Sequence, residues 1–305
     1  MSAPRTGPPT GVPSLADPPA LRDALDQAGY LIGNRDAVAV WLAMTLERPL
    51  LVEGPPGVGK TELARALART FSRRLISLPC HEGLDQNRAV FEWDHARQLL
   101  HLESVRRSPR ATSTPVAALD DEGIYAERFL LERPLLAALR SPDPVVLLID
   151  EIDRADESFE ALLLEFLDRF EITVPEIGTI STSSVPTVIL TSNDTRDLAD
   201  ATRRRCLRLG LGYPEPEAER QILRRAVPHL DAALGDHLLA VLGRLRASGL
   251  RRPPGVSEGI DWARAVEALG RRTLDDDTVL DTLPVILKHD VDVMAIRAAF
   301  GPPDP

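Results

Sequence analysis

One short stretch of the chain has the spacing of a phosphate-binding loop. Residues Gly54–Thr61 read GPPGVGKT, fit the pattern G-x-x-x-x-G-K-[ST], follow an apolar run at 49–54 and open the helical pattern TELARALARTF. Glycines there let backbone N–H groups turn toward phosphate oxygens, and the start of a helix adds positive potential. Lys60 would reach the terminal phosphates, and the Thr61 hydroxyl would coordinate Mg²⁺. The stretch therefore predicts a site for a nucleoside triphosphate with its magnesium ion.

A pair of acids follows a second apolar run, in VVLLIDEIDRAD at 145–156. Asp150 would organise the metal, and Glu151 would orient and partly deprotonate a water aimed at the terminal phosphate. A kinase would need an acceptor hydroxyl where that water sits. The alternative for Glu151 is an ordinary solvated acid after a strand. We interpret Asp153 and Asp156 as exposed acids at the start of a helix, where they favour its dipole.

A third apolar run, PTVILTSN at 186–193, ends in an amide. Asn193 would hydrogen-bond the attacking water or the γ-phosphate, although an ordinary turn residue at a strand end is the alternative. The predicted nucleotide-binding residues are Gly54, Pro55, Pro56, Gly57, Val58, Gly59, Lys60, Thr61, Glu62 and Asp150, and the predicted metal ligands among them are Thr61 and Asp150.

Three adjacent arginines, Arg203–Arg205, stand out in a chain of net charge −10. By spacing alone they fit a solvated basic patch as well as a site for concentrated negative charge. Arg205 immediately precedes the last predicted strand, away from the phosphate loop of its own chain, so it would reach a phosphate most easily in a neighbouring subunit. Supplying such a group in trans is worth roughly 10³ to 10⁵ in rate. The predicted catalytic residues are therefore Glu151, Asn193 and Arg205.

The elements that must position these residues alternate between helical periods and short apolar runs. Buried parallel strands are expected at 49–54, 73–79, 144–150, 186–193 and 206–212. This alternation predicts an α/β fold with a parallel sheet wrapped by helices, and after Pro214 only helical periods remain. We expect a disordered tail at 1–20, an α/β nucleotide-binding domain at 21–212 with an insertion at about 83–113 and a hairpin at about 171–185, and a helical lid domain at 213–305.

Composition restricts the class of protein. The net charge of −10 argues against general affinity for nucleic acid or anionic lipid. The two cysteines, Cys80 and Cys206, lie far apart, which is typical of a reducing compartment. No apolar run approaches the ~20 residues of a membrane span, and the first residues lack the layout of a signal peptide. We expect a cytoplasmic protein.

The chain resembles the MoxR-type AAA+ ATPases, most closely the CoxD-like branch linked to maturation of molybdenum-dependent carbon monoxide dehydrogenase. The resemblance runs from about Leu31 to Asp292 and includes LLVEGPPGVGKTELARALA, LLIDEIDRADESFEALLLEFL, TVPEIGTI, LTSNDTRDLADATRRRC and PPGVSEGIDWARA. By motif, Gly54–Thr61 resembles the Walker A loop, and Asp150 and Glu151 resemble Walker B. Asn193 resembles sensor 1. Arg205 resembles the arginine finger, an assignment that holds to within one position of the chain. Asp168-Arg169-Phe170 mimics a finger tripeptide but follows the Walker B helix, so we interpret it as a decoy.

The resemblance implies an AAA+ P-loop NTPase core with a small helical lid, binding ATP and Mg²⁺ and assembling as a homo-oligomeric ring, a hexamer. It also implies remodelling or maturation of a metalloenzyme apoprotein, with an adaptor protein that carries a von Willebrand factor A domain. In one place the chain departs from the family. Many members carry a sensor 2 arginine in an S-P-R segment of the lid, where this chain has PPGVSEGIDWARA; Arg251, Arg252 or Arg264 are candidates to substitute.

Two other functions fit the same motifs. A monomeric P-loop kinase or phosphotransferase would act on a small molecule and would not depend on assembly. A nucleotide-gated scaffold would bind ATP but turn it over very little, and the missing sensor 2 signature favours it. A DNA-directed role is disfavoured by the acidic chain and by the lack of an aromatic-basic stripe.

Overall fold

A five-stranded parallel sheet is the centre of the larger domain in the computed structural model, which describes residues 16–107, 123–175 and 177–300. Its strand order is β2-β5-β8-β1-β9, and every neighbouring pair is parallel. The sheet confirms the predicted α/β fold, because all five expected strands are in it. They are β1 (Leu50–Glu53), β2 (Leu75–Pro79), β5 (Val146–Asp150), β8 (Thr187–Ser192) and β9 (Leu207–Gly210).

Helices cover both faces of the sheet, so alternate residues of the strands enter two separate cores. On one face Val146 and Leu148 pack with α1 (Pro18–Gln27), α2 (Asn34–Thr45) and α3 (Lys60–Thr70). On the other face Leu147 and Ile149 pack with α6 (Pro134–Leu139) and α7 (Glu157–Arg169). This alternation, with both sets buried, explains why the strands read as continuous apolar runs.

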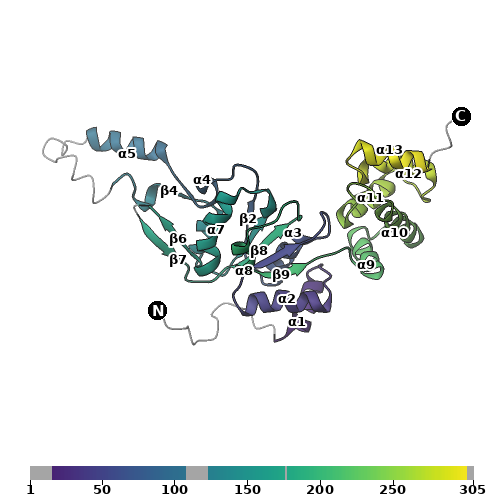
Figure 1. Ribbon diagram of the computed structural model, residues 1–305, viewed down its shortest axis with the longest axis horizontal. Helices are drawn as coiled ribbons and strands as arrows, with labels where there is room; N and C mark the ends of the chain where they lie inside the picture. The colour runs from purple at the N-terminus through teal and green to yellow at the C-terminus, as the bar shows by residue number, and fades with distance from the viewer. Residues whose placement is uncertain (1–15, 108–122, 176, 301–305) are drawn as a thin grey trace.

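Two smaller sheets extend the sheet domain on the side away from the C-terminal helices (Figure 1). The first is an antiparallel pair, β3 (Phe91–Trp93) and β4 (Leu130–Glu132), with α4 (Gln86–Ala89) before it and α5 (His95–Arg107) between its strands. The segment α4 to α5 falls within the range predicted as an insertion, 83–113, and β4 lies beyond that range; residues 108–113 lie outside the described part. The second pair, β6 (Glu171–Val174) and β7 (Gly178–Ser181), is antiparallel and lies within the range predicted as a hairpin.

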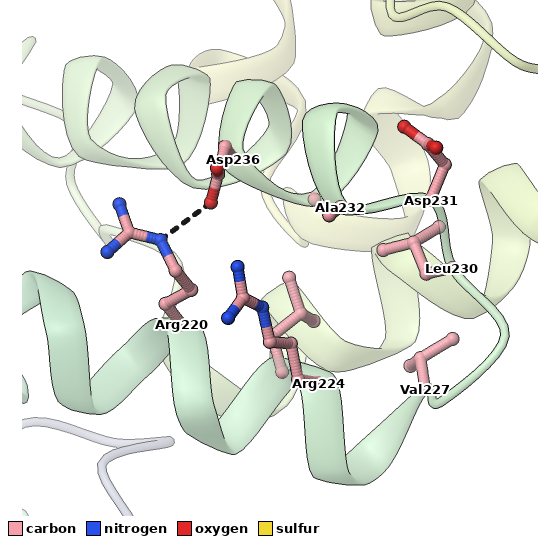
Figure 2. Close-up of a pocket in the computed structure, with 9 residues that line it drawn as sticks. Arg220, Arg224, Val227, Leu230, Asp231, Ala232 and Asp236 are labelled. Atoms are coloured by element: carbon pink, nitrogen blue, oxygen red, sulfur yellow. Dashed lines mark hydrogen bonds and ion pairs between the residues drawn. The ribbon is translucent and has the colours of Figure 1, made fainter.

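The C-terminal part consists of helices with a core of its own. The helices are α9 (Pro216–Ala226), α10 (Ala232–Ala247), α11 (Val256–Ala268), α12 (Asp276–Ile286) and α13 (Asp290–Phe300). Trp262 is fully buried among them, and its indole N–H donates to Thr282 Oγ1 at 2.6 Å. A crevice between α9 and α10, bridged by Arg220 and Asp236 at 2.6 Å, has a volume of about 10 Å³ (Figure 2). It has room for no more than about one water molecule.

Three further findings bear on the sequence predictions. Helix α1 begins at Pro18 with Asp17 as its N-cap, so ordered structure starts before the expected boundary, whereas residues 1–15 of the expected tail lie outside the described part. Cys80 and Cys206 are both free and buried. Among the described helices, none combines the length and the apolar character that crossing a membrane requires.

Candidate active site

A cleft of about 780 Å³ lies between the sheet domain and the C-terminal helices. The residues predicted to bind phosphate form its floor, and residues of α9 and α11 form its opposite wall. Of the predicted site residues, the structure places the following in the lining: Pro56, Gly57, Val58, Gly59, Lys60, Thr61, Glu62, Asp150, Glu151 and Asn193. Gly54, Pro55 and Arg205 are not among the lining residues.

The phosphate loop keeps a backbone shape that depends on glycine. Gly54 has φ of 154°, and a Cβ there would lie 2.0 Å from the carbonyl oxygen of Leu211, the residue that follows β9. Gly59, with φ of 99°, is the N-cap of α3. The first N–H groups of α3 have no partner within the helix, so they are available to an anion at this point.

Lys60 is buried, with 6% of its surface exposed, and its ammonium bonds three oxygens. It donates to the carbonyl oxygens of Gly54 and Pro55, each at 2.7 Å, and to Asn193 Oδ1 at 2.8 Å. Burial lowers the pKa of Lys60, and the carboxylates of Asp153, Asp150 and Glu151 partly oppose that change. The loop lysine and the strand-end amide, 133 residues apart in the chain, are therefore already in contact.

Thr61 and Asp150 form a pair of hard oxygen ligands. The Thr61 hydroxyl donates to Asp150 Oδ1 at 2.9 Å, and the Thr191 hydroxyl donates to the same oxygen at 2.6 Å. Within the described ranges no group of three or more His, Cys, Asp or Glu side chains is arranged to hold a metal ion. This donor set fits Mg²⁺, which is held in nucleotide sites by one or two protein oxygens together with phosphates and waters.

Glu151 is held in an uncommon conformation at the end of β5. Its backbone is left-handed, with φ of 56° and ψ of 50°, and its N–H donates to Thr191 Oγ1 at 2.8 Å. Non-glycine residues adopt this region rarely and often at functional sites. One carboxylate oxygen accepts from Asn193 Nδ2 at 3.2 Å and the other from Arg154 Nη1 at 2.8 Å.

Asp153 corrects a sequence interpretation, because it is not an exposed acid of a helix start. Only 4% of it is exposed, and it accepts hydrogen bonds from the backbone N–H of Asn193 at 3.2 Å and of Thr195 at 3.1 Å, and from the Thr195 hydroxyl at 2.5 Å. Burial alone would raise the pKa of Asp153, but these hydrogen bonds outweigh it and lower the pKa. Asp156 is exposed at the start of α7, as expected.

Glu62 lies in the cleft, but its carboxylate is paired within its own helix. It contacts Arg69 at 2.7 Å and Arg65 at 3.7 Å. Both ion pairs are partly exposed, so each contributes little to stability.

The start of α11 contacts the phosphate loop directly. The backbone N–H groups of Val256 and Ser257 point to the carbonyl oxygen of Gly57, at 2.9 and 3.3 Å. A Cβ on Gly255 would lie 2.7 Å from the Cα of Gly57, so the two backbones approach as closely as glycine permits. This contact is made by the segment PPGVSEGIDWARA, which departs from the S-P-R segment that the resemblance led us to expect. The phosphate loop and the start of α11 are therefore joined through backbone atoms.

The structure separates the three candidates for a lid arginine. Arg264, on α11, lines the cleft. Arg251 and Arg252 are not among the lining residues, and their backbone N–H groups donate to the buried carboxylate of Asp292, at 2.9 and 3.3 Å. Of the three, Arg264 is therefore placed to meet a ligand.

The arginine segment lies on α8 (Asp200–Arg205), which leads into β9. Arg203 pairs with the buried carboxylate of Glu53 at 3.1 Å. Arg205 Nε lies 3.4 Å from Asp168 Oδ1, and its Nη1 donates to the carbonyl oxygen of Ala201 at 3.0 Å. Arg204 is exposed, and its side chain makes no ion pair with any residue in the described part of the chain.

Arg205 lies at the amino end of the sheet, opposite the phosphate loop. Leu207 pairs with Leu50, the first residue of β1, and its N–H bonds the carbonyl oxygen of Pro49. The loop begins after Glu53, and four strand residues span roughly 13 Å at about 3.3 Å each. The structure therefore does not bring Arg205 together with Lys60 of its own chain.

Comparisons with known proteins agree with this geometry. The model of the ATPase family associated with various cellular activities (AAA) matches residues 50–211, more than half of the chain. The chain belongs to this family. Protein NorQ of Paracoccus denitrificans (strain Pd 1222) is 24% identical over 276 residues, covering 82% of this chain and 89% of NorQ.

Solved structures that resemble this AAA chain include two mutants of RuvB from Thermotoga maritima. One has a TM-score of 0.48 and 20% identity, with 88% of this chain and 74% of that chain covered. The other has a TM-score of 0.47 and 18% identity, with 89% and 71% covered.

Three parts of the AAA site were missed by sequence reasoning. Thr191 lies two positions before Asn193, and in the sequence it looks like an ordinary strand residue. Asp153 has the sequence signal of any helix start, and Gly255 that of any loop glycine. Only the packed structure shows that these residues contact Asp150, Asn193 and Gly57.

Proposed function

We propose that the chain is a Mg·ATP-hydrolysing AAA+ ATPase of the MoxR type. The observation that carries this proposal is the contact between loop and strand ends: Lys60 bonds Asn193, and Asn193 bonds Glu151, at the carboxyl edge of the sheet. NorQ, a MoxR-type AAA+ protein that matches most of both chains, supports the type. ATP is the substrate, and ADP and phosphate are the products.

Each residue has a role that its position permits. Lys60 and the N–H groups of α3 hold the terminal phosphates and stabilise the charge that develops on them. Glu151 accepts a hydrogen bond from the attacking water and orients it, and Asn193 fixes the Glu151 carboxylate. Bound between Thr61, Asp150 and the phosphates, Mg²⁺ would neutralise phosphate charge.

A ring completes the site, because an arginine at the amino end of the sheet faces away from the loop of its own chain. Arg205, or its exposed neighbour Arg204, reaches the terminal phosphate bound to the adjacent subunit. Head-to-tail contacts of this kind close into rings when the rotation permits it. Hydrolysis then depends on assembly, as a hexamer by resemblance to the family.

A mixing experiment tests this proposal. The Glu151→Gln protein has a defective site and an intact arginine, and the Arg205→Ala protein has the reverse. Each should be inactive alone, and a one-to-one mixture should restore up to roughly a quarter of the wild-type rate, since each of two positions is filled correctly half of the time. No recovery, with assembly of the mixture shown by light scattering, contradicts a trans-acting Arg205. Mixing Arg204→Ala with Glu151→Gln in the same way shows whether Arg204 or Arg205 is the trans-acting arginine.

The work done by the ring is proposed from the MoxR resemblance: remodelling or maturation of a metalloenzyme, with carbon monoxide dehydrogenase as the candidate client. The ring would meet its client through an adaptor with a von Willebrand factor A domain. Deleting the coding sequence should leave the client's apoprotein present with an incomplete metal site. Elemental analysis of the purified client measures this, and a full metal complement would contradict the proposed role.

One observation favours the nucleotide-gated scaffold as a second function. Both carboxylate oxygens of Glu151 are already bonded, to Asn193 and to Arg154. Each oxygen has a second lone pair that can accept from water, but the ion pair with Arg154 weakens the carboxylate as a base toward that water. Steady-state phosphate release separates the two functions, because a scaffold would bind ATP with a turnover indistinguishable from that of the Glu151→Gln protein.

A further inference from the structure

A second buried carboxylate, Glu160 on α7, binds the segment that carries the arginines. Glu160 is 2% exposed, and its Oε2 accepts from the backbone N–H of Ala199 at 3.0 Å and from the Thr202 hydroxyl at 3.1 Å. Its Oε1 pairs with Arg196 Nη2 at 2.6 Å, and the same nitrogen donates to the carbonyl oxygen of Ala155 at 2.5 Å. Thus a single side chain bonds the connector before α8, the residue that starts α8 and the interior of α8.

A buried charge in this position is costly unless all its partners are in place. An apolar side chain of similar size would pack against α8, but it would not fix the rotation of the helix about its axis. Three directional contacts do fix it, since Ala199 and Thr202 lie one helical turn apart and present their donors to one oxygen. Glu160 therefore determines the direction in which the side chains of Arg204 and Arg205 leave α8.

We propose that Glu160 is a positioning residue for the reaction of the neighbouring subunit, acting through α8 on the arginine that enters the adjacent site. The inference rests on the proposed ring function. Glu160 lies on α7, which begins six residues after Glu151, but it contacts no residue of its own phosphate site. Loss of the Glu160 carboxylate should weaken the contribution of the subunit's arginine to the neighbouring site, while the phosphate site of the same subunit stays intact.

Asp153 supplies the contrasting case within the same segment. It bonds Asn193 and Thr195, so it acts on the site of its own chain. The two acids lie seven residues apart, and both hold the connector that follows β8. A variant of Glu160 should therefore be rescued by a subunit with an intact arginine, and a variant of Asp153 by a subunit with an intact phosphate site.

The test uses purified full-length variants, alone and in one-to-one mixtures. Glu160→Gln alone should lose about 10-fold or more of its ATP turnover, a smaller loss than complete removal of a trans arginine. Its affinity for a fluorescent ATP analogue should stay within about twofold of wild type. When Glu160→Gln is mixed with Glu151→Gln, ATP turnover should recover to the level of the mixture of Arg205→Ala with Glu151→Gln. When Glu160→Gln is mixed with Arg205→Ala, ATP turnover should not recover. Asp153→Asn should show the reverse pattern. Glu157→Gln, at an exposed position on the same helix, is the matched control.

A turnover of Glu160→Gln equal to that of Glu157→Gln overturns the inference. So does an inactive Glu160→Gln that stays inactive with Glu151→Gln, because a residue that merely stabilises the domain would damage its own site as well. Thr202→Val, which removes one donor to Glu160 without changing volume, repeats the comparison if Glu160→Gln does not fold. If the Arg205→Ala and Glu151→Gln mixture itself fails to recover, the ring proposal fails, and the inference fails with it.

Discussion

The two ends of the central sheet differ in how far a single chain completes them. At the carboxyl edge, charged and polar groups from the loop, β5 and β8 bond one another: Lys60 with Asn193, Thr61 with Asp150, and Asn193 with Glu151. At the amino edge, the end of α8 carries Arg205, which pairs with Asp168, and Arg204, which is exposed, whereas Arg203 reaches back to Glu53 at the carboxyl end of β1.

The difference shows where a second molecule is needed. We expect the carboxyl edge to bind and orient a triphosphate with its own groups, since Lys60 is buried and the partly buried Thr61, Asp150, Glu151 and Asn193 are already joined by hydrogen bonds. At the amino edge, the exposed Arg204 forms no ion pair within the described part of the chain. Binding of the nucleotide should thus be a property of one chain, and rapid cleavage a property of the assembly.

The largest effect is expected at the carboxyl edge. Lys60→Ala removes the buried ammonium that we expect to bind the terminal phosphates, so ATP turnover should fall by about 10²-fold to 10³-fold, with loss of ATP affinity. Phosphate release and equilibrium binding measure both. Lys288, the second of the two lysines in the chain, is exposed and far from the cleft, and Lys288→Ala should leave both quantities unchanged. A Lys60→Ala protein that still binds ATP tightly would mean that the loop is not the phosphate site.

Asp153→Asn should give a smaller loss, confined to the chemical step. The amide cannot accept from all three donors as the carboxylate does, so Asn193 and Glu151 lose their alignment. We expect kcat to fall about 10-fold to 100-fold with KM changed by less than about threefold. A rise in KM with kcat unchanged would show that Asp153 serves binding and not alignment.

Gly255→Ala tests the contact between the lid and the loop. The added methyl group would overlap the Gly57 backbone, so α11 must move away and the cleft must widen. ATP affinity should fall about 10-fold, and hydrogen exchange at the start of α11 should speed up and respond less to ATP. Gly243→Ala, on α10 where a Cβ meets nothing within 4 Å, is the matched control. An unchanged ATP affinity in Gly255→Ala would show that the start of α11 and the phosphate loop are not coupled.

The smallest effect is expected from the lid arginine. Arg264 is largely exposed and contacts Asp261 at 3.4 Å, so its pull on a phosphate is screened by water. Arg264→Ala should weaken ATP binding about threefold to 10-fold and leave ADP binding nearly unchanged, whereas Arg252→Ala should change neither. Equal losses for ATP and ADP would indicate that Arg264 does not distinguish the terminal phosphate.

The strands and the phosphate loop could be predicted because their signals are local. A strand buried on both faces reads as an apolar run, and the spacing of GPPGVGKT is itself the geometry of the loop. The burial of Asp153 and Glu160 could not be predicted, because an acid after a strand or within a helix looks the same whether it faces solvent or a distant N–H group. The short strands β3 and β4 were missed for a related reason, since three residues give too little periodicity to identify.

The dependence of ATP turnover on protein concentration shows whether catalysis needs contact between subunits. Specific activity should be measured across a dilution series, with the fraction of single chains and rings followed by sedimentation at each point. The account predicts that ATP binding stays constant while turnover per chain falls by at least about 10²-fold as the rings dissociate. A preparation shown to be single chains that splits ATP at the rate of the rings would contradict it.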